Sequence, residues 1–330
     1  MIHRNEIMLY RMKKRFTLSN IKKRYTRQVA LTKAKSILYS FFRLFLLVGL
    51  TYLICMPFFV KLSSSFMSKS DLYDAMVKFI PRNFTLENYR YVIRETEYFK
   101  ALFNTVFISL LCAVLQTLSC AMIGYGLAKF KFKGRGVITA IAIFTMIVPP
   151  DATINALYMN FKFFNPLGLL GLFTDQLPNL LDTVFPLTIL SATGFALKNG
   201  IYIILMRQFF KGVPDEMLEA AEVDGAGCIR TFFKIILPMA VPMLSIIFVL
   251  SFAWQWTDSY YSSLLFQDFD VLSNIINAVA QIGGAGYSGS KYSSVLINTA
   301  SVLILAPLIL FYLFAQKLNV QSIERTGLVG

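Results

Sequence analysis

The sequence predicts an all-α membrane protein with six transmembrane helices. Of its 330 residues, 56% are hydrophobic and 15% are charged, whereas soluble domains carry about 25% charged residues. The apolar residues gather in six long blocks, and a helix of about 20 residues crosses a ~30 Å hydrocarbon core. The net charge is +14, and the basic residues stand between the blocks. That placement is typical of membrane topology and lipid contact, not of nucleic-acid binding.

The blocks are predicted to be helices because hydrocarbon offers the backbone no hydrogen-bonding partner. A basic segment, residues 1–36, precedes the first block. It is too long for the charged region of a cleavable signal peptide, so the first block is expected to remain as a span. A short tail, residues 316–330, follows the last block. The predicted spans, which with their loops form a membrane domain over residues 37–315, cover residues 37–60, 101–127, 137–158, 183–206, 239–262 and 293–315.

The distribution of Lys and Arg predicts the side of the membrane that each loop faces. Most of the 32 Lys and Arg residues lie in four places: the N-terminal segment, the loops after the second and fourth blocks, and the tail. Cytoplasmic loops carry an excess of these residues, so both termini are expected in the cytoplasm. The opposite loop at residues 263–292 is rich in Gly and Ser and is expected to be a flexible external loop.

The reactive side chains argue against catalysis and metal binding by this chain. Its cysteines, Cys55, Cys112, Cys120 and Cys228, form no C-x-x-C pair, and three of them lie in apolar blocks, which favours a packing role. The only histidine is His3, which removes most histidine-based chemistry. The phosphate-binding pattern G-x-x-x-x-G-K-[ST] is missing from the sequence. We therefore expect no catalytic residue, no metal and no bound cofactor.

The loop between the fourth and fifth blocks, residues 207–238, predicts a short exposed helix–turn–helix. Pro214 suits a first helical turn, where its missing N–H costs no hydrogen bond, and acidic residues follow near the positive end of the helix dipole. Gly225 can end this helix with a positive φ. A second helix is expected to run into the fifth block, with Pro238 at the membrane boundary. Small residues such as Ala221 would let the first helix seat closely in a groove of another protein.

This loop resembles the EAA motif of ABC importer permeases, E-A-A-x3-G-x9-I-x-L-P. Every fixed position is matched, with Asp224 beside the glycine: Glu219, Ala220, Ala221, Gly225, Ile235, Leu237 and Pro238. Shorter stretches resemble the sugar-importing subgroup, especially its smaller, maltose-type permease subunit. They lie at residues 84–89, 104–105, 129–136, 207–210 and 256–258. The resemblance extends from about residue 37 to the end of the chain. Thr257 stands where the subgroup's Trp-Asn-Asp has asparagine. The resemblance does not explain the basic N-terminal segment.

The resemblance implies a permease subunit of a type I ABC importer in a bacterial plasma membrane, carrying a sugar or oligosaccharide. In that family the EAA loop is a coupling helix that docks into a cleft of a cytoplasmic ATPase subunit. Two ATPases close on ATP and Mg, and the permease pair switches between inward-open and outward-open states. The implied partners are a second permease subunit in a heterodimer, two ATP-binding subunits, an extracellular solute-binding protein and the lipid bilayer, without nucleic acid. The permease itself is not an enzyme.

Ionisable residues inside the blocks are functional candidates, because a charge at membrane depth is costly. Asp151 in the third block and Lys198 in the fourth are predicted to pair or to face the central pathway. A shifted span boundary that leaves one of them in water is the alternative. Further pathway candidates lie near the outer end of the fifth block: Trp254, Gln255, Trp256 and Asp258. Sugars need hydrogen-bonding groups and flat aromatic faces, but helix–helix hydrogen bonds and an interfacial aromatic belt explain these residues equally well.

Two other classes of transporter are weighed against this interpretation. An ABC permease for an amino acid or a peptide would share the EAA loop, but the sugar-subgroup stretches argue against it. A secondary carrier driven by protons or sodium would need ion-coupling carboxylates in its spans. Only Asp151 lies deep, and the EAA loop would then have no role.

Overall fold

The structure, a computed structural model, describes residues 2–74, 76–174, 176–286 and 290–327. It divides into two units, Met1–Val60 and Lys61–Gly330, which are described separately. The described residues are helical apart from turns and one isolated antiparallel bridge between Met67 and Phe84. The helices are α1 (Ile2–Ser65), α2 (Lys69–Tyr73), α3 (Glu87–Glu95), α4 (Tyr98–Lys129), α5 (Arg135–Ile147), α6 (Pro150–Lys162), η1 (Pro166–Gly168), η2 (Leu170–Leu172), α7 (Phe185–Thr193), α8 (Asn199–Lys211), α9 (Glu216–Val223), α10 (Cys228–Thr231), η3 (Phe232–Ile236), α11 (Leu237–Met239), α12 (Val241–Thr257), α13 (Tyr260–Leu265), α14 (Leu272–Gly286) and α15 (Ser290–Gly327).

Helix α4 is the central helix of the second unit and contacts α7, α8 and α12. Glycines allow the helices around it to approach one another closely. A Cβ added to Gly124 would lie 2.6 Å from the Cβ of Met206 on α8, and one added to Gly200 would lie 2.5 Å from the carbonyl oxygen of Ala142 on α5. Small residues at such crossings let helices pack closely in lipid, where van der Waals contact drives their association.

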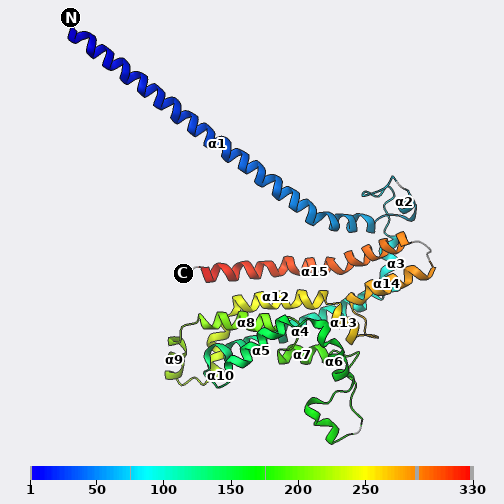
Figure 1. Cartoon of the computed structure of the whole chain (residues 1–330). Coiled ribbons are helices and arrows are strands. Elements are labelled where there is room, and N and C mark those ends of the chain that lie inside the picture. Colours follow the sequence, from blue (N-terminus) through cyan, green and yellow to red (C-terminus); the bar gives the residue numbers. More distant parts are fainter. Residues whose placement is uncertain (1, 75, 175, 287–289, 328–330) are drawn as a thin grey trace. The chain divides into compact units, whose positions relative to one another are not determined.

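The two ends of α4 mark two ends of this unit, with α9 and α10 at one and α13 and α14 at the other (Figure 1). At its C-terminal end, Lys129 Nζ lies 2.5 Å from Asp215 Oδ1 beside α9. Near its N-terminal end, Thr105 Oγ1 accepts a hydrogen bond from the Leu272 N–H at the start of α14. We call these the coupling end and the far end.

Three predicted spans coincide with continuous helices. Within the described part of the chain, three helical stretches are long and apolar enough to cross a membrane: Lys35–Ser65, Tyr98–Lys129 and Tyr292–Gln316. They contain the predicted spans at residues 37–60, 101–127 and 293–315. The number rises to five if each of two sharply bent helix pairs counts as one span. The total of six spans stays a prediction.

The third and fourth predicted spans are interrupted, and local backbone chemistry explains both breaks. Helices α5 and α6 meet at 105°, where Pro149 and Pro150 stand together; a proline disfavours helical geometry in the residue before it and removes one N–H donor. Helices α7 and α8 are separated by Gly194, at φ +80°, and Lys198, at φ +69°. Both values lie in the left-handed region, which a right-handed helix cannot contain.

The fifth predicted span is shorter than expected, and its entry is sharply bent. The helical run Cys228–Met239 meets α12 at 78°, with Ala240 at the corner between Pro238 and Pro242. A π-helical turn, η3, directly precedes Leu237 and Pro238. Prolines and π-turns are common causes of such kinks. Asp258 then ends α12, before the boundary predicted at residue 262.

The loop expected at residues 263–292 is helical over most of its length, and its external position stays a prediction. Helix α14 occupies much of it and packs against α15. Leu272, Ile275 and Val279 are all buried, and their spacing places them on one side of the helix. Residues 287–289 lie outside the described part of the chain.

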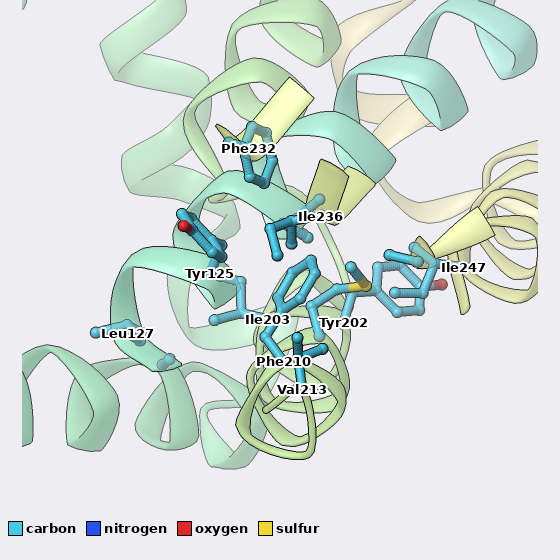
Figure 2. Packing of buried hydrophobic residues seen from close by; sticks show 14 residues of the cluster. Tyr125, Leu127, Tyr202, Ile203, Phe210, Val213, Phe232, Ile236 and Ile247 are labelled. Carbon is cyan, nitrogen blue, oxygen red and sulfur yellow. The ribbon is translucent and has the colours of Figure 1, made fainter. Parts of the chain in front are cut away.

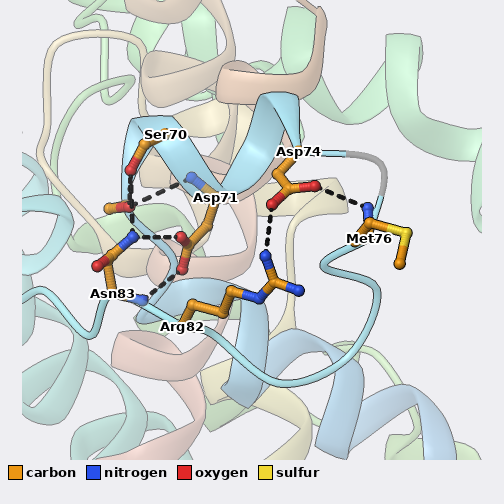
Figure 3. A network of polar contacts seen from close by, with 7 residues as sticks. Ser70, Asp71, Asp74, Met76, Arg82 and Asn83 are labelled. Atoms are coloured by element: carbon orange, nitrogen blue, oxygen red, sulfur yellow. Dashed lines mark hydrogen bonds and ion pairs between the residues drawn. The ribbon is translucent and has the colours of Figure 1, made fainter.

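The segment that leads into α3 is closed by a network of polar contacts (Figure 3). The Asp71 carboxylate is buried and accepts hydrogen bonds from the backbone N–H and the side-chain Nδ2 of Asn83, both at 2.8 Å. Asp74 pairs with Arg82 at 2.9 Å, where both side chains are exposed. The backbone N–H of Asn83 is the main cause that lowers the pKa of Asp71 below its ordinary 3.8. Charged Asp71 therefore stabilises this segment above the ordinary pKa, and the contribution is lost as pH falls through the lowered pKa.

We expect Asp71→Ala to loosen residues 67–84 and Asp74→Ala to leave them nearly unchanged. Loss of Asp71 removes both hydrogen bonds that a buried carboxylate makes to Asn83, whereas an exposed ion pair contributes little. Amide hydrogen exchange in detergent should speed up by about tenfold or more in this segment for Asp71→Ala. Equal protection in the two variants would contradict the structural role of Asp71.

Candidate functional site

The short helix α9 carries the Glu-Ala-Ala run and lies at the coupling end. It begins at Glu216 with Asp215 as its N-cap. The prediction that Pro214 occupies the first turn is therefore wrong, because Pro214 precedes the helix. Gly225 follows the helix at φ +74°, as the sequence predicted. The Ala226 N–H donates to the Ala221 carbonyl at 2.9 Å, which with the Gly225 N–H to Glu222 forms a Schellman ending.

A buried lysine fixes the start of α9. Lys129, the last residue of α4, is 7% exposed at its side chain, whereas Asp215 is 75% exposed. Its Nζ donates to Asp215 Oδ1 at 2.5 Å and to the Val213 carbonyl at 2.6 Å. The hydrogen bond from Lys129 lowers the pKa of the Asp215 carboxyl. This contact joins the central helix directly to α9, and nothing in the sequence singled out Lys129 for that role.

The two sides of α9 differ sharply in exposure. Ala221 is buried, and Leu218 packs against the cluster of buried apolar residues below the helix. Facing away, Val223 is 88% exposed, and Ile229 at the start of α10 is 76% exposed. A Cβ added to Gly225 would meet no atom of this chain within 4 Å. The other exposed residues of the motif are Glu219, Ala220, Asp224 and Pro238.

An aromatic cluster supports the loop from below (Figure 2). The rings of Tyr125 on α4 and Phe232 in the π-turn are 4.9 Å apart, and Tyr125 and Phe210 on α8 are 5.5 Å apart. Ile236 is fully buried in the same cluster, while the motif residues Ile235 and Leu237 pack against it. The loop is therefore held by α4, α8 and the run that leads into α12.

Asp151 and Lys198, predicted to pair or to share the pathway, have different partners in the structure. Asp151 lies in the first turn of α6, exposed, and accepts a hydrogen bond from the Tyr260 hydroxyl. Lys198 lies in the break before α8, and its Nζ stands 4.6 Å from the ring centre of Trp254. The straight helices assumed in counting their depths are interrupted at both sites, by the bend between α5 and α6 and by the break before α8.

Lys198 lines a cavity of about 590 Å³ between the ends of α5, α6, α7 and α8. A much smaller cavity adjoins it and shares Leu197 and Tyr261 with it. Trp254, Gln255 and Asp258 line this smaller cavity. The structure thus brings together four of the six residues predicted for the pathway.

Trp256 does not belong with the other residues predicted for the pathway. It is 2% exposed, packs against Phe252, and donates its indole N–H to the Ile304 carbonyl at 3.1 Å. Trp254, two positions earlier, is 48% exposed, because helical residues two positions apart point to nearly opposite sides of the helix, about 200° apart. Trp256 therefore joins α12 to α15 and does not face the cavities.

Asp258 has a structural task as well as a place beside the smaller cavity. Its carboxylate accepts hydrogen bonds from the N–H groups of Tyr260, Tyr261 and Ser262, at 3.1 to 3.2 Å, and from the Ser262 hydroxyl. It thereby turns the chain from α12 into α13. Gln116 of α4 accepts a hydrogen bond from Ser251 of α12. Such hydrogen bonds between helices are the alternative to a role in sugar contact.

Comparisons with known proteins give a family match and several similar permeases. The family described as binding-protein-dependent transport system inner membrane component matches residues 121–325. The chain is 25% identical over 289 residues to the arabinooligosaccharides transport system permease protein AraQ of Bacillus subtilis, covering 87% of this chain and 94% of AraQ. It is 28% identical over 253 residues to the trehalose transport system permease protein SugB of Mycobacterium tuberculosis, covering 77% of this chain and 85% of SugB.

Two further similarities support less, one because it covers only part of the relative and the other because its sequence identity is low. The alpha-glucoside transport system permease protein AglG of Rhizobium meliloti is 28% identical over 237 residues, which is 70% of this chain but 57% of AglG. A solved chain of a bacterial ABC transporter involved in the import of the acidic polysaccharide alginate superposes with a TM-score of 0.66 at 23% identity. The alignment covers 85% of this chain and 96% of that one. At this identity the likeness shows the fold.

Proposed function

The chain belongs to the binding-protein-dependent transport system inner membrane components, and from this membership we propose that it is a membrane-spanning permease subunit of an ATP-driven saccharide importer. The observation that carries the proposal is α9, a short helix fixed to α4 by Lys129, with exposed apolar residues and an unobstructed Gly225. A helix so placed can transmit the movement of a partner protein into the bundle.

The proposed partner at α9 is a cytoplasmic ATP-binding subunit. Val223 and Ile229 supply exposed apolar contact area, and Gly225 leaves room for close approach; exposed apolar groups of this kind mark protein interaction sites. The full assembly would contain two ATP-binding subunits, a second permease subunit and an extracellular solute-binding protein. ATP and Mg would be bound by the ATP-binding subunits.

The proposed orientation places the coupling end in the cytoplasm and the far end outside. The excess of Lys and Arg in the N-terminal segment and in the loops after the second and fourth predicted spans supports it. The protein would then be a multi-pass component of a bacterial plasma membrane with both termini inside. Ligand would pass from the far end toward the cavity beside Lys198.

The relatives favour a saccharide as the cargo. Those named above are permeases for arabinooligosaccharides, trehalose and alpha-glucosides. An importer of amino acids or peptides is therefore not favoured. Trp254 is 48% exposed and shares the lining of its cavity with Gln255 and Asp258, which fits a sugar that needs a flat aromatic face and hydrogen-bonding groups.

Co-purification tests the proposal. We would tag this chain, express it with the genes beside it, and extract it in mild detergent. An ATP-binding subunit is expected in the purified complex, with saccharide uptake that requires ATP. Uptake that persists without ATP, together with no associated ATPase, would instead indicate a secondary carrier.

A further inference from the structure

Lys198 is the only charged side chain among the described residues that line the 590 Å³ cavity. The rest of the lining is apolar or carries hydroxyls, including those of Thr145, Thr153 and Thr193. Such a mixture, with few polar groups in a mostly apolar hollow of roughly 300–1,000 Å³, is typical of ligand sites. The lining of this cavity therefore carries one positive charge, while Asp258 and Trp254 line the smaller cavity that adjoins it.

Two carboxylates on elements around the cavity already accept hydrogen bonds. Asp151 accepts a hydrogen bond from Tyr260, and both oxygens of Asp258 accept hydrogen bonds where α13 begins. Lys198 forms no ion pair with either of them, and its ammonium lies over the face of the Trp254 ring. A cation–π contact attracts the ammonium but leaves its charge unneutralised.

The backbone holds Lys198 in an unusual conformation. Its φ of +69° lies in the left-handed region, which residues other than glycine, asparagine and aspartate seldom adopt. Such conformations persist where the surrounding structure imposes them, often at ligand sites. Lys198 is also the N-cap of α8, where the helix dipole adds positive potential.

We infer that Lys198 and Trp254 form a subsite for an acidic saccharide, a sugar chain that carries a uronic acid carboxylate. The carboxylate would pair with the Lys198 ammonium and draw it from the indole, and the freed face of Trp254 would then receive a sugar ring. Hydroxyls such as that of Thr153 would bond the sugar hydroxyls. A lysine ammonium pairs as a point charge with a carboxylate or a phosphate, so the test below includes a phosphorylated sugar to tell the two apart. The inference rests on the proposed function and names its substrate class.

The test uses the complete importer, with both permeases, its ATP-binding subunits and its solute-binding protein, in proteoliposomes. Initial uptake is measured for three probes: trigalacturonate, the neutral maltotriose and a phosphorylated glucose. We expect wild type to prefer trigalacturonate. Lys198→Met should raise the KM for trigalacturonate by about tenfold or more, as for loss of one partner of a buried charge pair. Lys198→Arg should keep most of the uptake, and Trp254→Ala should weaken it.

A matched control is Lys162, whose Nζ stands 5.6 Å from the Tyr158 ring centre outside the cavity lining. Lys162→Met should leave the KM unchanged, and subunit yield in the complex checks assembly of each variant. Preference of wild type for maltotriose or the phosphorylated sugar overturns the inference whatever the variants do. So does an unchanged KM in Lys198→Met, and in both cases the proposed function stands. If none of the three probes enters while ATP-driven transport of an amino acid or a peptide is found, the proposed function fails and the inference with it.

Discussion

Replacing Gly225 with Asp is expected to uncouple transport from ATP hydrolysis while the subunit still folds. The position has φ +74° and no neighbouring atom of this chain within 4 Å of an added Cβ. Within the subunit the change therefore costs only the left-handed backbone, about 1–2 kcal/mol. Against a docked partner, the new carboxylate would fill the open space and carry an unpaired charge into the interface, beside Asp224 and Glu222.

We expect substrate-stimulated ATPase activity of the Gly225→Asp complex to fall about thirtyfold or more, the size of a hot-spot loss near 2 kcal/mol. Gly227→Asp is the matched control. It lies two residues away, it also has open space around an added Cβ, and its φ of −67° suits any residue. Aspartate is a favourable N-cap there for α10. Equal activity of both variants at the wild-type level would show that α9 does not carry the coupling.

Replacing Gly124 with Ala is expected to destabilise the bundle itself. The new Cβ would lie 2.6 Å from the Met206 Cβ and 2.9 Å from the Arg207 backbone nitrogen, so α4 and α8 must move apart. Overpacking of this kind costs about 1–3 kcal/mol. We expect the apparent Tm of the detergent-solubilised subunit to fall by about 3–10 °C and its yield in membranes to drop.

Gly126→Ala serves as the control on the same helix. Its added Cβ would lie 3.9 Å from a ring carbon of Phe130, which is an ordinary contact distance. Alanine is the better helix former, so this variant should equal or exceed the wild type in Tm. If Gly124→Ala were as stable as Gly126→Ala, the close approach of α4 to α8 would be wrong.

The sequence predicted the coupling loop well because the signals there are local. Gly225 after an acidic, alanine-rich run indicates a helix that ends in the left-handed region, and the structure contains that ending. The long apolar stretches likewise predicted α4 and the apolar parts of α1 and α15 as continuous helices. In each of these cases neighbouring residues alone determine the backbone.

The pathway residues were harder to place because their positions depend on helix breaks. A depth counted at a constant rise put Asp151 and Lys198 inside straight spans, but Pro149 and Pro150 turn the chain by 105° and Lys198 stands in the left-handed region. Trp254 and Trp256 could not be told apart without knowing which side of α12 faces α15. Lys129 gained its role from a contact with a residue 86 positions away, which no local pattern encodes.

Site-specific cross-linking tests the central claim, that α9 is the docking point of an ATP-binding subunit, most directly. In a variant with Cys55, Cys112, Cys120 and Cys228 replaced by Ser, a single cysteine would be placed at Val223. The control is a single cysteine at Phe173, which is about as exposed as Val223 and lies in the segment between α6 and α7. Val223→Cys carrying a photoreactive thiol reagent is expected to cross-link to the ATP-binding subunit, with a yield that changes when ATP is added. A cross-link from Phe173→Cys but none from Val223→Cys would contradict the account.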